Sequence, residues 1–228
     1  MIVAIDGPAG SGKTTTARRV AESIGFVHID TGAMYRAATL QALNDGIDIA
    51  DDDALVDLSH RVHIELKQEP GDTTKQVVLL NGEDVTAAIR TPQVDLLVSR
   101  VSEVAGVRTE IVNQQRVMAA SIDVVMEGRD IGTVVFPNAD VKVYLVASLK
   151  ERSRRRQKEL ALRGISMPIA EVLADLERRD QHDSTRAVAP LKPAPDAVWL
   201  DTTELTIDRQ IQEVIARVRA KQQESRHQ

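Results

Sequence analysis

The sequence contains no cysteine, which excludes disulfide bonds and thiol chemistry. Aromatic residues make up only 2% of the 228 residues, which argues against aromatic surfaces that stack the bases of single-stranded nucleic acid. A formal net charge of −5 argues against nonspecific nucleic-acid binding by the protein as a whole. No apolar run approaches the length of a membrane span, and the N-terminus leads into a strand rather than a secretory signal. We therefore expect a protein with no nucleic-acid or membrane partner. The lack of cysteine is compatible with a cytoplasmic protein, and nothing in the sequence demands more than a monomer.

Short apolar runs rich in β-branched residues alternate with helical patterns along the chain. These runs predict strands at Ile2–Ile5, Val27–Ile29, Ile122–Met126, Val141–Val146 and Val198–Leu200. None of them alternates strictly with polar residues, as is typical of strands buried on both faces. Helices between such strands are typical of α/β proteins, so we predict a five-stranded parallel sheet flanked by helices.

One stretch departs from this pattern. The segment RVHIELKQEPGDTTKQVVLLNGEDV alternates like antiparallel strands, with turns predicted at Glu69–Asp72 and at Asn81-Gly82. Thr91 and Pro92 then predict an N-cap and a first-turn proline, in a helical region that we expect to be interrupted near Gly106. This stretch therefore predicts an inserted α+β domain.

A basic helical segment, LKERSRRRQKELALRG, follows the fourth predicted strand and ends at Gly164. A second predicted helix has Ser166 and Pro168 near its start, and the chain ends in a helical tail, AKQQESRHQ. The predicted organisation is a core of residues 1–36, 106–150 and 187–228, an insertion of residues 37–105, and a lid with its following helix at residues 151–186.

The first apolar run leads into GPAGSGKT, which fits the pattern G-x-x-x-x-G-K-[ST] of phosphate-binding loops (P-loops). Glycines let the backbone wrap around an anion, and the N-terminus of the following helix, predicted over Lys13–Ile24, adds positive charge. Lys13 supplies a mobile charge for the β- and γ-phosphates, and Thr14 supplies a hydroxyl for Mg²⁺. We expect this segment, called the phosphate loop below, to bind ATP with Mg²⁺. The motif does not say what the triphosphate is used for.

Polar segments follow the second and third predicted strands, at the sheet edge where ligands of open α/β sheets bind. In DTGAMYR, a binding role and a plain helix cap by Asp30 or Thr31 are equally good explanations. In EGRDIGT, Glu127 ends a buried strand, where an acid in phosphate-loop proteins typically orders the hydration shell of the metal. Arg129 and Asp130 follow, either facing the phosphate loop, which we favour, or forming a local ion pair.

Two charged segments come later in the chain. The arginine run that includes Arg152 and Arg156 is either a solvated helix face or a lid over the triphosphate. Arg179, Asp183 and Arg186 recur at intervals of four and three residues on one predicted helix face, for which a salt-bridge ladder is by itself the better explanation. We predict no zinc site, because no metal-ligand pattern is formed by the five histidines, which are His28, His60, His63, His182 and His227.

Four segments in the same order, GPAGSGKT, DTGAMYR, EGRDIGTVVFP and RRDQHDSTRAVAPL, strongly resemble those of the bacterial cytidylate kinases, a family of nucleoside monophosphate kinases. The resemblance extends from Ile2 to about Leu200. It implies a parallel-sheet core, a mobile nucleotide-acceptor domain, which the antiparallel insertion resembles, and a short lid. It also implies phosphorylation of CMP and dCMP to CDP and dCDP by ATP, by direct in-line transfer with Mg²⁺, in pyrimidine nucleotide metabolism.

The resemblance also implies roles for single residues. The ATP-binding segment would consist of Gly7, Pro8, Ala9, Gly10, Ser11, Gly12, Lys13, Thr14 and Thr15. The acceptor-binding residues would be Thr31, Arg108 and Asp130 at cytosine, Arg36, Arg129 and Arg186 at the phosphate, and Arg179 and Asp183 at the sugar hydroxyls, with Tyr35 packing nearby. The lid would contribute Arg152, Arg155 and Arg156, and the catalytic charges would be Lys13, Arg129, Arg152, Arg156 and Arg186. Thr14 and, through water, Glu127 would hold the metal. The chain departs from the family pattern at two positions: Thr31 stands where serine is common in the family, and Glu127 stands where the shorter aspartate is common.

Asp130 and Arg108 would distinguish cytosine from uracil. An acid accepts a hydrogen bond from the amino group of cytosine, and an arginine donates to the ring nitrogen and carbonyl beside it. Uracil presents a carbonyl acceptor and an N–H donor in these places, so both protein groups would be left unpaired. Each unpaired buried polar group costs ~1–3 kcal/mol, so we expect CMP to be preferred over UMP by about a hundredfold or more. No general base is required, because phosphoryl transfer depends mainly on positioning and charge neutralisation.

Two alternatives remain open at this point. One is a kinase for another small acceptor, such as UMP or shikimate. The other is a nucleotide-dependent switch, although the nearest match to the guanine-reading motif N-K-x-D, Asn81-Gly82-Glu83-Asp84, lacks the lysine.

Overall fold

The structure, a computed structural model, describes residues 1–69 and 72–226. Pro70 and Gly71 of the first predicted turn, and His227 and Gln228 of the predicted tail, lie outside the described residues. The chain divides into two compact units. The first unit is Met1–His28 together with the chain from Val124 onward, and the second unit is Ile29–Asp123. Within the described ranges, no helix has both the length and the apolar character needed to cross a membrane.

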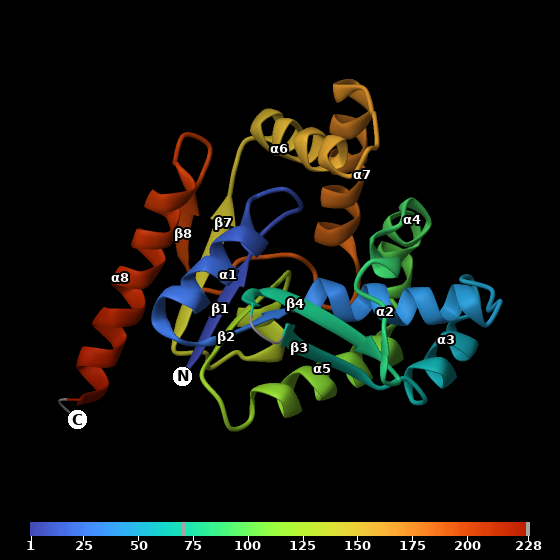
Figure 1. Cartoon of the computed structure of the whole chain (residues 1–228), viewed down its shortest axis with the longest axis horizontal. Helices are drawn as coiled ribbons and strands as arrows, with labels where there is room; N and C mark the ends of the chain where they lie inside the picture. The colour runs from blue at the N-terminus through green and yellow to red at the C-terminus, as the bar shows by residue number, and fades with distance from the viewer. Residues whose placement is uncertain (70–71, 227–228) are drawn as a thin grey trace. The chain divides into compact units, whose positions relative to one another are not determined.

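The first unit is built on a parallel sheet. In the described part of the chain this sheet has five strands, as predicted, and their order is β2-β6-β1-β7-β8. Figure 1 labels β1, β2, β7 and β8 among them. The strands are β1 (Ile2–Asp6), β2 (Val27–Asp30), β6 (Val124–Gly128), β7 (Val141–Val146) and β8 (Val198–Asp201). The helices are α1 (Lys13–Ile24), α6 (Leu149–Leu162), α7 (Ile169–Thr185) and α8 (Ile207–Arg226), and a π-helical turn covers Ile131–Val135.

Strand β1 lies between β6 and β7, and its register places Asp6 beside Gly128 and Tyr144. Because parallel strands end at the same sheet edge, the segments that follow β1, β6 and β7 start there together. Helices α1 and α8 pack on the sheet through an apolar core that includes Val20 and Val214. The sheet edge with the carboxyl ends of these strands is therefore where the first unit gathers its polar loops.

The helix predicted over Lys13–Ile24 is confirmed to the residue, and it ends at Gly25, whose φ of 74° is left-handed. The predicted start of the third strand is wrong by two residues. Ile122 is 41% exposed, and β6 begins at Val124, which pairs with Ile2. An apolar residue just before a strand thus extended the prediction into the preceding turn.

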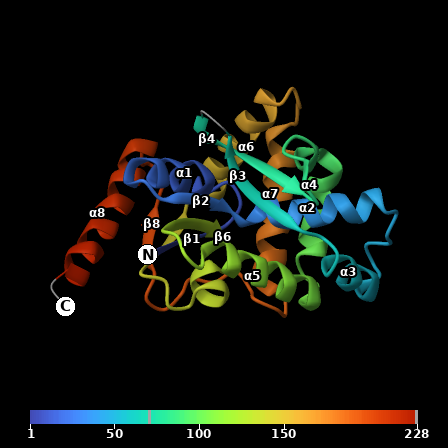
Figure 2. The ribbon, with the colours of Figure 1, turned by 60° about the horizontal axis from the view of Figure 1, so that its bottom comes forward.

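The second unit contains a small antiparallel sheet, in which the described strands have the order β3-β4-β5. Figure 2 shows β3 and β4 side by side. Its elements are α2 (Thr31–Asn44), α3 (Asp52–Ser59), β3 (Ile64–Glu69), β4 (Asp72–Leu80), β5 (Glu83–Asp84), a 3₁₀ turn at Ala88–Arg90, α4 (Pro92–Val101) and α5 (Ala105–Ala119). The turn predicted at Asn81-Gly82 joins β4 to β5 with φ values of 52° and 89°, as a tight hairpin requires. The antiparallel insertion predicted from alternation is therefore present.

The predicted helix start at Thr91 and Pro92 is confirmed, and the interruption predicted near Gly106 is found at residues 102–104. Helix α4 ends at Val101, and Gly106 lies inside α5. A Cβ atom on Gly106 would lie 2.5 Å from Cγ2 of Val56 on α3. The glycine is needed for close packing between α3 and α5 rather than for interrupting the helix.

Candidate active site

The phosphate loop connects β1 to α1 and presents its backbone N–H groups without side-chain competition. A Cβ atom on Gly7 would lie 2.1 Å from the carbonyl oxygen of Leu145, so the loop passes against β7 as only glycine allows. Gly12 is the N-cap of α1, with φ of 94° and no side chain capping the helix. The first-turn N–H groups of α1 are thus available to an anion.

Lys13 is buried at the start of α1, and its Nζ donates to the backbone oxygen of Pro8 at 2.8 Å. Burial, followed by the positive charge of Arg129, lowers the pKa of Lys13 to about 7, although Glu127 and Asp6 act in the opposite direction. The lysine therefore lies inside the loop, where a bound triphosphate would supply the negative charge that it lacks.

Thr14 and Glu127 meet across the loop. The Thr14 hydroxyl donates to Oε2 of Glu127 at 3.0 Å, and Glu127 lies at the end of β6 with 3% of its surface exposed. Hydroxyl and carboxylate oxygens are the ligands that Mg²⁺ prefers, directly or through its water shell. The residues present thus fit the metal that the sequence predicts, and they belong to one unit.

Asp6 is a residue that the sequence analysis missed. Its carboxylate accepts hydrogen bonds from the N–H groups of Ile131 and Gly132, both at 2.8 Å. It thereby fixes the start of the π-helical turn directly after Arg129 and Asp130. Burial raises the pKa of Asp6 to about 6, against the lowering effect of these two hydrogen bonds. An acid immediately before the phosphate loop was the signal that could have identified it.

Two arginines with opposite-charge neighbours lie on the segments after β6 and at the end of α7. Arg129 donates to Asp183 at 2.8 Å, and Nη2 of Arg186 lies 3.9 Å from Asp130. Burial alone would lower the pKa of Arg129, but Asp183 outweighs it and holds this pKa above its usual value. Burial would raise the pKa of Asp183, but Arg129 holds it below its usual value. The structure thus joins, in one cluster, residues predicted from two distant segments.

The prediction that Arg179, Asp183 and Arg186 share one helix face is wrong for the last of them. Arg186 is the C-cap of α7, with a ψ of 142°, and its Nε donates to the carbonyl oxygen of Ala189 at 2.7 Å. The chain has left the helix there, so the side chain is aimed by the following turn. Arg179 remains on α7, one turn before Asp183.

Helices α6 and α7 pack against the phosphate loop. Ala9 joins an apolar cluster with Leu160 and Val172, and Arg152 donates to the Ala9 carbonyl oxygen at 3.1 Å. Arg152 also contacts Asp180 at 2.6 Å. The predicted lid residue Arg152 is therefore buried against the loop.

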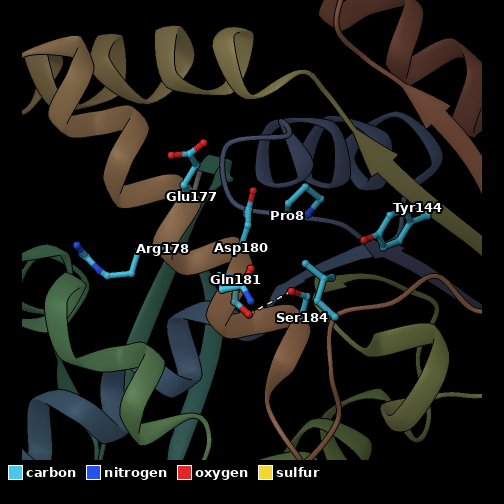
Figure 3. A pocket seen from close by; sticks show the side chains of 8 residues that line it. Pro8, Tyr144, Glu177, Arg178, Asp180, Gln181 and Ser184 are labelled. Carbon is cyan, nitrogen blue, oxygen red and sulfur yellow. Dashed lines mark hydrogen bonds between the residues drawn. The ribbon is translucent and has the colours of Figure 1, made fainter.

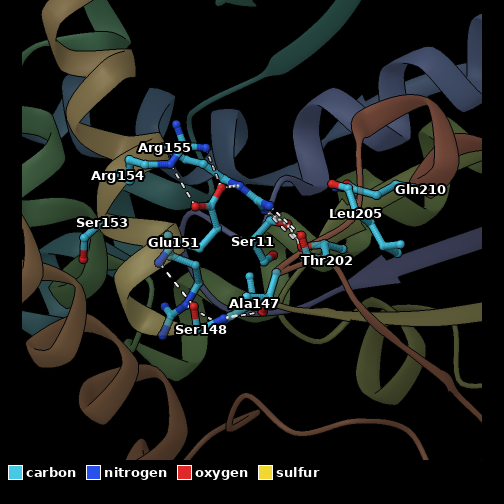
Figure 4. A network of polar contacts seen from close by, with 12 residues as sticks. Ser11, Ala147, Ser148, Glu151, Ser153, Arg154, Arg155, Thr202, Leu205 and Gln210 are labelled. Carbon is cyan, nitrogen blue, oxygen red and sulfur yellow. Dashed lines mark hydrogen bonds and ion pairs between the residues drawn. The ribbon is translucent and has the colours of Figure 1, made fainter.

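The other two predicted lid arginines differ from Arg152. Arg155 donates to the carbonyl oxygen of Ser11 at 3.3 Å and to the hydroxyl and carbonyl oxygens of Thr202 at 3.0 and 2.6 Å (Figure 4). It thus connects α6, the phosphate loop and the end of β8. Arg156 is paired with Glu159 on its own helix at 2.5 Å.

An open pocket of about 630 Å³ lies beside the phosphate loop (Figure 3). Its lining comes from the loop, β7, α7 and the segment after α7, and consists of Pro8, Tyr144, Glu177, Arg178, Asp180, Gln181, Ser184 and Leu191. Polar side chains of α7 thus face a space large enough for part of a nucleotide.

The remaining predicted site residues belong to the second unit and are described within it. Asp30 accepts from the N–H of Ala33 at 3.1 Å, so the helix-cap explanation is correct for Asp30. Thr31 is the first residue of α2 and is buried. Arg108 donates to the Ser102 carbonyl oxygen at 3.0 Å, and its guanidinium lies 5.3 Å from the centre of the Tyr35 ring.

Arg36 also lies on α2, with Nη1 2.6 Å from Asp95. Burial lowers the pKa of Arg36, although Asp95 acts in the opposite direction. Thr31, Tyr35, Arg36 and Arg108 are therefore held in one unit, whereas Asp130 and Arg186 are held in the other.

A family model described as cytidylate kinase matches residues 3–220 of the chain. The cytidylate kinase of Lactobacillus gasseri is 48% identical over 218 residues, covering 96% of this chain and 92% of its own. The cytidylate kinase of Desulforamulus reducens is 50% identical over 213 residues, covering 93% of this chain and 94% of its own. An uncharacterized protein from Eubacterium ventriosum has a solved structure with a TM-score of 0.50 at 10% identity, covering 95% of this chain and 96% of its own, a likeness of fold alone.

Proposed function

Because the chain belongs to the cytidylate kinase family, we propose that it transfers the γ-phosphoryl group of ATP to CMP and dCMP, forming ADP with CDP or dCDP. The observation that carries this proposal is the buried cluster of Arg129 with Asp183 and Arg186 with Asp130, in the same unit as the phosphate loop. Such arginines beside a nucleotide-binding loop suit the binding of a second anionic substrate.

The ATP side of the reaction rests on the phosphate loop. Residues Gly7 to Thr15 bind the triphosphate through backbone N–H groups, and Lys13 leaves the Pro8 carbonyl to contact the β- and γ-phosphates. Thr14 and, through water, Glu127 would hold Mg²⁺, which when bound neutralises part of the charge of the triphosphate. Arg152 and Arg156 on α6 are the proposed lid charges, and Arg155 supports the loop from behind.

The roles proposed on the acceptor side are those that the family resemblance implies. Arg36, Arg129 and Arg186 bind the phosphate of CMP. Thr31, Arg108 and Asp130 read the base, with Tyr35 packing beside it, and Arg179 and Asp183 bind the sugar hydroxyls. Residues 37–105 form the acceptor-binding part and residues 151–186 the lid of a monomeric enzyme. Transfer is in line and direct, because both phosphate ends are held by fixed positive charges and water is excluded when the lid closes.

The proposal is tested by measuring ADP formation from ATP and Mg²⁺ with CMP, dCMP, UMP, AMP, GMP or no acceptor. We expect strong turnover with CMP and dCMP, weak turnover with UMP, and almost none without an acceptor. Turnover that does not depend on the acceptor would identify an ATPase or a switch instead. If another monophosphate is the preferred acceptor, the proposed phosphoryl transfer from ATP stands, but the proposed reading of cytosine by Arg108 and Asp130 is overturned.

A further inference from the structure

Glu127 has a second partner that the reaction described above does not use. Nε2 of His28, on strand β2, lies 3.2 Å from Oε1 of Glu127, while Thr14 donates to Oε2 at 3.0 Å. His28 and Glu127 are 7% and 3% exposed, whereas Thr14 is exposed. One carboxylate oxygen thus contacts the exposed hydroxyl, and the other contacts a ring on the buried side. All three residues belong to the first unit.

The contact with His28 restricts the positions that the Glu127 carboxylate can occupy. The glutamate side chain has one more rotatable bond than aspartate, so its carboxylate can occupy more positions, and ordering it costs conformational entropy. Packing restrains the torsion angles of such a side chain but does not by itself direct each carboxylate oxygen. A ring nitrogen on the adjacent strand, by contrast, fixes one oxygen at a defined point and leaves the other directed at Thr14.

The reach of the side chain also matters. An aspartate at position 127 would withdraw the carboxylate by about 1.5 Å, the length of one carbon–carbon bond. A hydrogen bond of 3.2 Å would then be lost unless the backbone moved. His28 therefore suits glutamate, and not aspartate, at this position.

We propose that His28 is a positioning residue for the magnesium-nucleotide site. Its Nε2–H donates to Oε1 of Glu127 and holds the carboxylate so that Oε2 and the Thr14 hydroxyl together receive the metal ion of MgATP. The inference rests on the proposed function only in using ATP with Mg²⁺, and it makes no claim about the acceptor. Its failure and the failure of the acceptor assignment are therefore distinguishable.

The test is calorimetric titration of the whole protein with ATP, once with excess MgCl₂ and once with EDTA. In H28L, which lacks the donor, we expect MgATP to bind about tenfold more weakly, the lower end for loss of a partner of a metal ligand, while metal-free ATP binds as in the parent. In H28Q, whose amide can donate, we expect most of the MgATP affinity to return. In the E127D background, we expect H28L to change MgATP affinity less than twofold.

The control is H60L, because His60 also faces a glutamate, Glu110, at 3.8 Å, but in the second unit. It should leave both ATP affinities unchanged. If H28L does not fold, the MgATP affinities of H28Q and H28N are compared instead. We expect H28N to bind MgATP more weakly than H28Q, because the asparagine side chain is too short to place its amide where the ring nitrogen lies. Equal losses for ATP with and without Mg²⁺, or an undiminished effect of H28L in the E127D background, would overturn the proposal. If the H28L effect appears while the acceptor assay fails, the metal inference stands and the acceptor assignment falls.

Discussion

Lys13 donates its Nζ hydrogen to the backbone oxygen of Pro8, five residues earlier, at 2.8 Å. The lysine therefore occupies the centre of the loop that is meant to receive the triphosphate. Its positive charge is poorly supported there, because burial and the nearby Arg129 both favour the neutral amine. Binding of a polyanion reverses this balance.

A proton should accordingly be taken up when MgATP binds. Lys13 has a pKa of about 7 in the free protein, below the ordinary 10.5. Phosphates raise it again, so between these two values the complex binds more protons than the free protein. At pH 8, calorimetry in buffers of different ionisation enthalpy should detect uptake of nearly one proton per MgATP. In K13Q the uptake should vanish, and an equal uptake in K13Q would contradict the assignment.

The Asp6 carboxylate should make stability depend on pH in a direction unusual for an acid. Its pKa is about 6 in the folded protein and 3.8 in the unfolded chain, so the folded state binds more protons between these values. The free energy of unfolding therefore decreases as pH rises through this window, by about 3 kcal/mol for Asp6 alone.

This dependence is isolated by comparing urea unfolding of the parent and D6N at several pH values from 4 to 7. The asparagine does not titrate, and its single oxygen can accept from only one of Ile131 and Gly132. We expect the difference in stability between the two proteins to change with pH as Asp6 titrates. Two parallel curves would show that the buried carboxylate does not titrate in this range.

Replacement of Asp130 by alanine should weaken discrimination between CMP and UMP. The variant removes the proposed acceptor for the cytosine amino group, so the ratio of kcat/KM for CMP to that for UMP should fall roughly ten- to a hundredfold. Arg186, whose Nη2 is 3.9 Å from Asp130, loses a neighbouring charge, so both rates also fall. The ratio is therefore the informative quantity. The control is D53A, on an exposed position of α3, and an unchanged ratio in D130A would remove the specificity argument.

Gly106 should not tolerate a side chain. In G106A the new methyl group would meet Val56 at 2.5 Å, and such overpacking costs about 1–3 kcal/mol, which exceeds the gain in helix propensity. Urea unfolding of G106A, V56A and the double variant measures the effect. We expect the double variant to lose less stability than the sum of the single losses, and simple additivity would argue against the contact.

Much of the fold could be predicted because its signals are local. Lys13–Ile24 follows from the motif before it and Gly25 after it, and Thr91 with Pro92 marks a helix start by side-chain capping and by fixed φ. The hairpin turn at Asn81-Gly82 likewise follows from two residues that accept positive φ. These features depend on neighbours within a few positions.

The relationships that were missed connect residues far apart in the chain. Asp6 contacts Ile131 across 125 positions, and His28 contacts Glu127 across 99. No periodicity links such positions, because they meet only through the strand order of the sheet. The prediction that Arg186 lies on a helix face was wrong for the opposite reason. Its spacing from Asp183 fits a helix face, but α7 ends one residue before Arg186.

The strand that carries the phosphate loop is synthesised long before the two strands that pair with it. Strand β1 pairs with β6 from Val124 and with β7 from Val141, and neither partner exists until more than half of the chain has been synthesised. The second unit, by contrast, is contiguous and can close its own core as soon as it emerges from the ribosome. The nascent N-terminal segment, with apolar side chains and two unpaired strand edges, is therefore the part of this chain that most needs protection by a chaperone during translation.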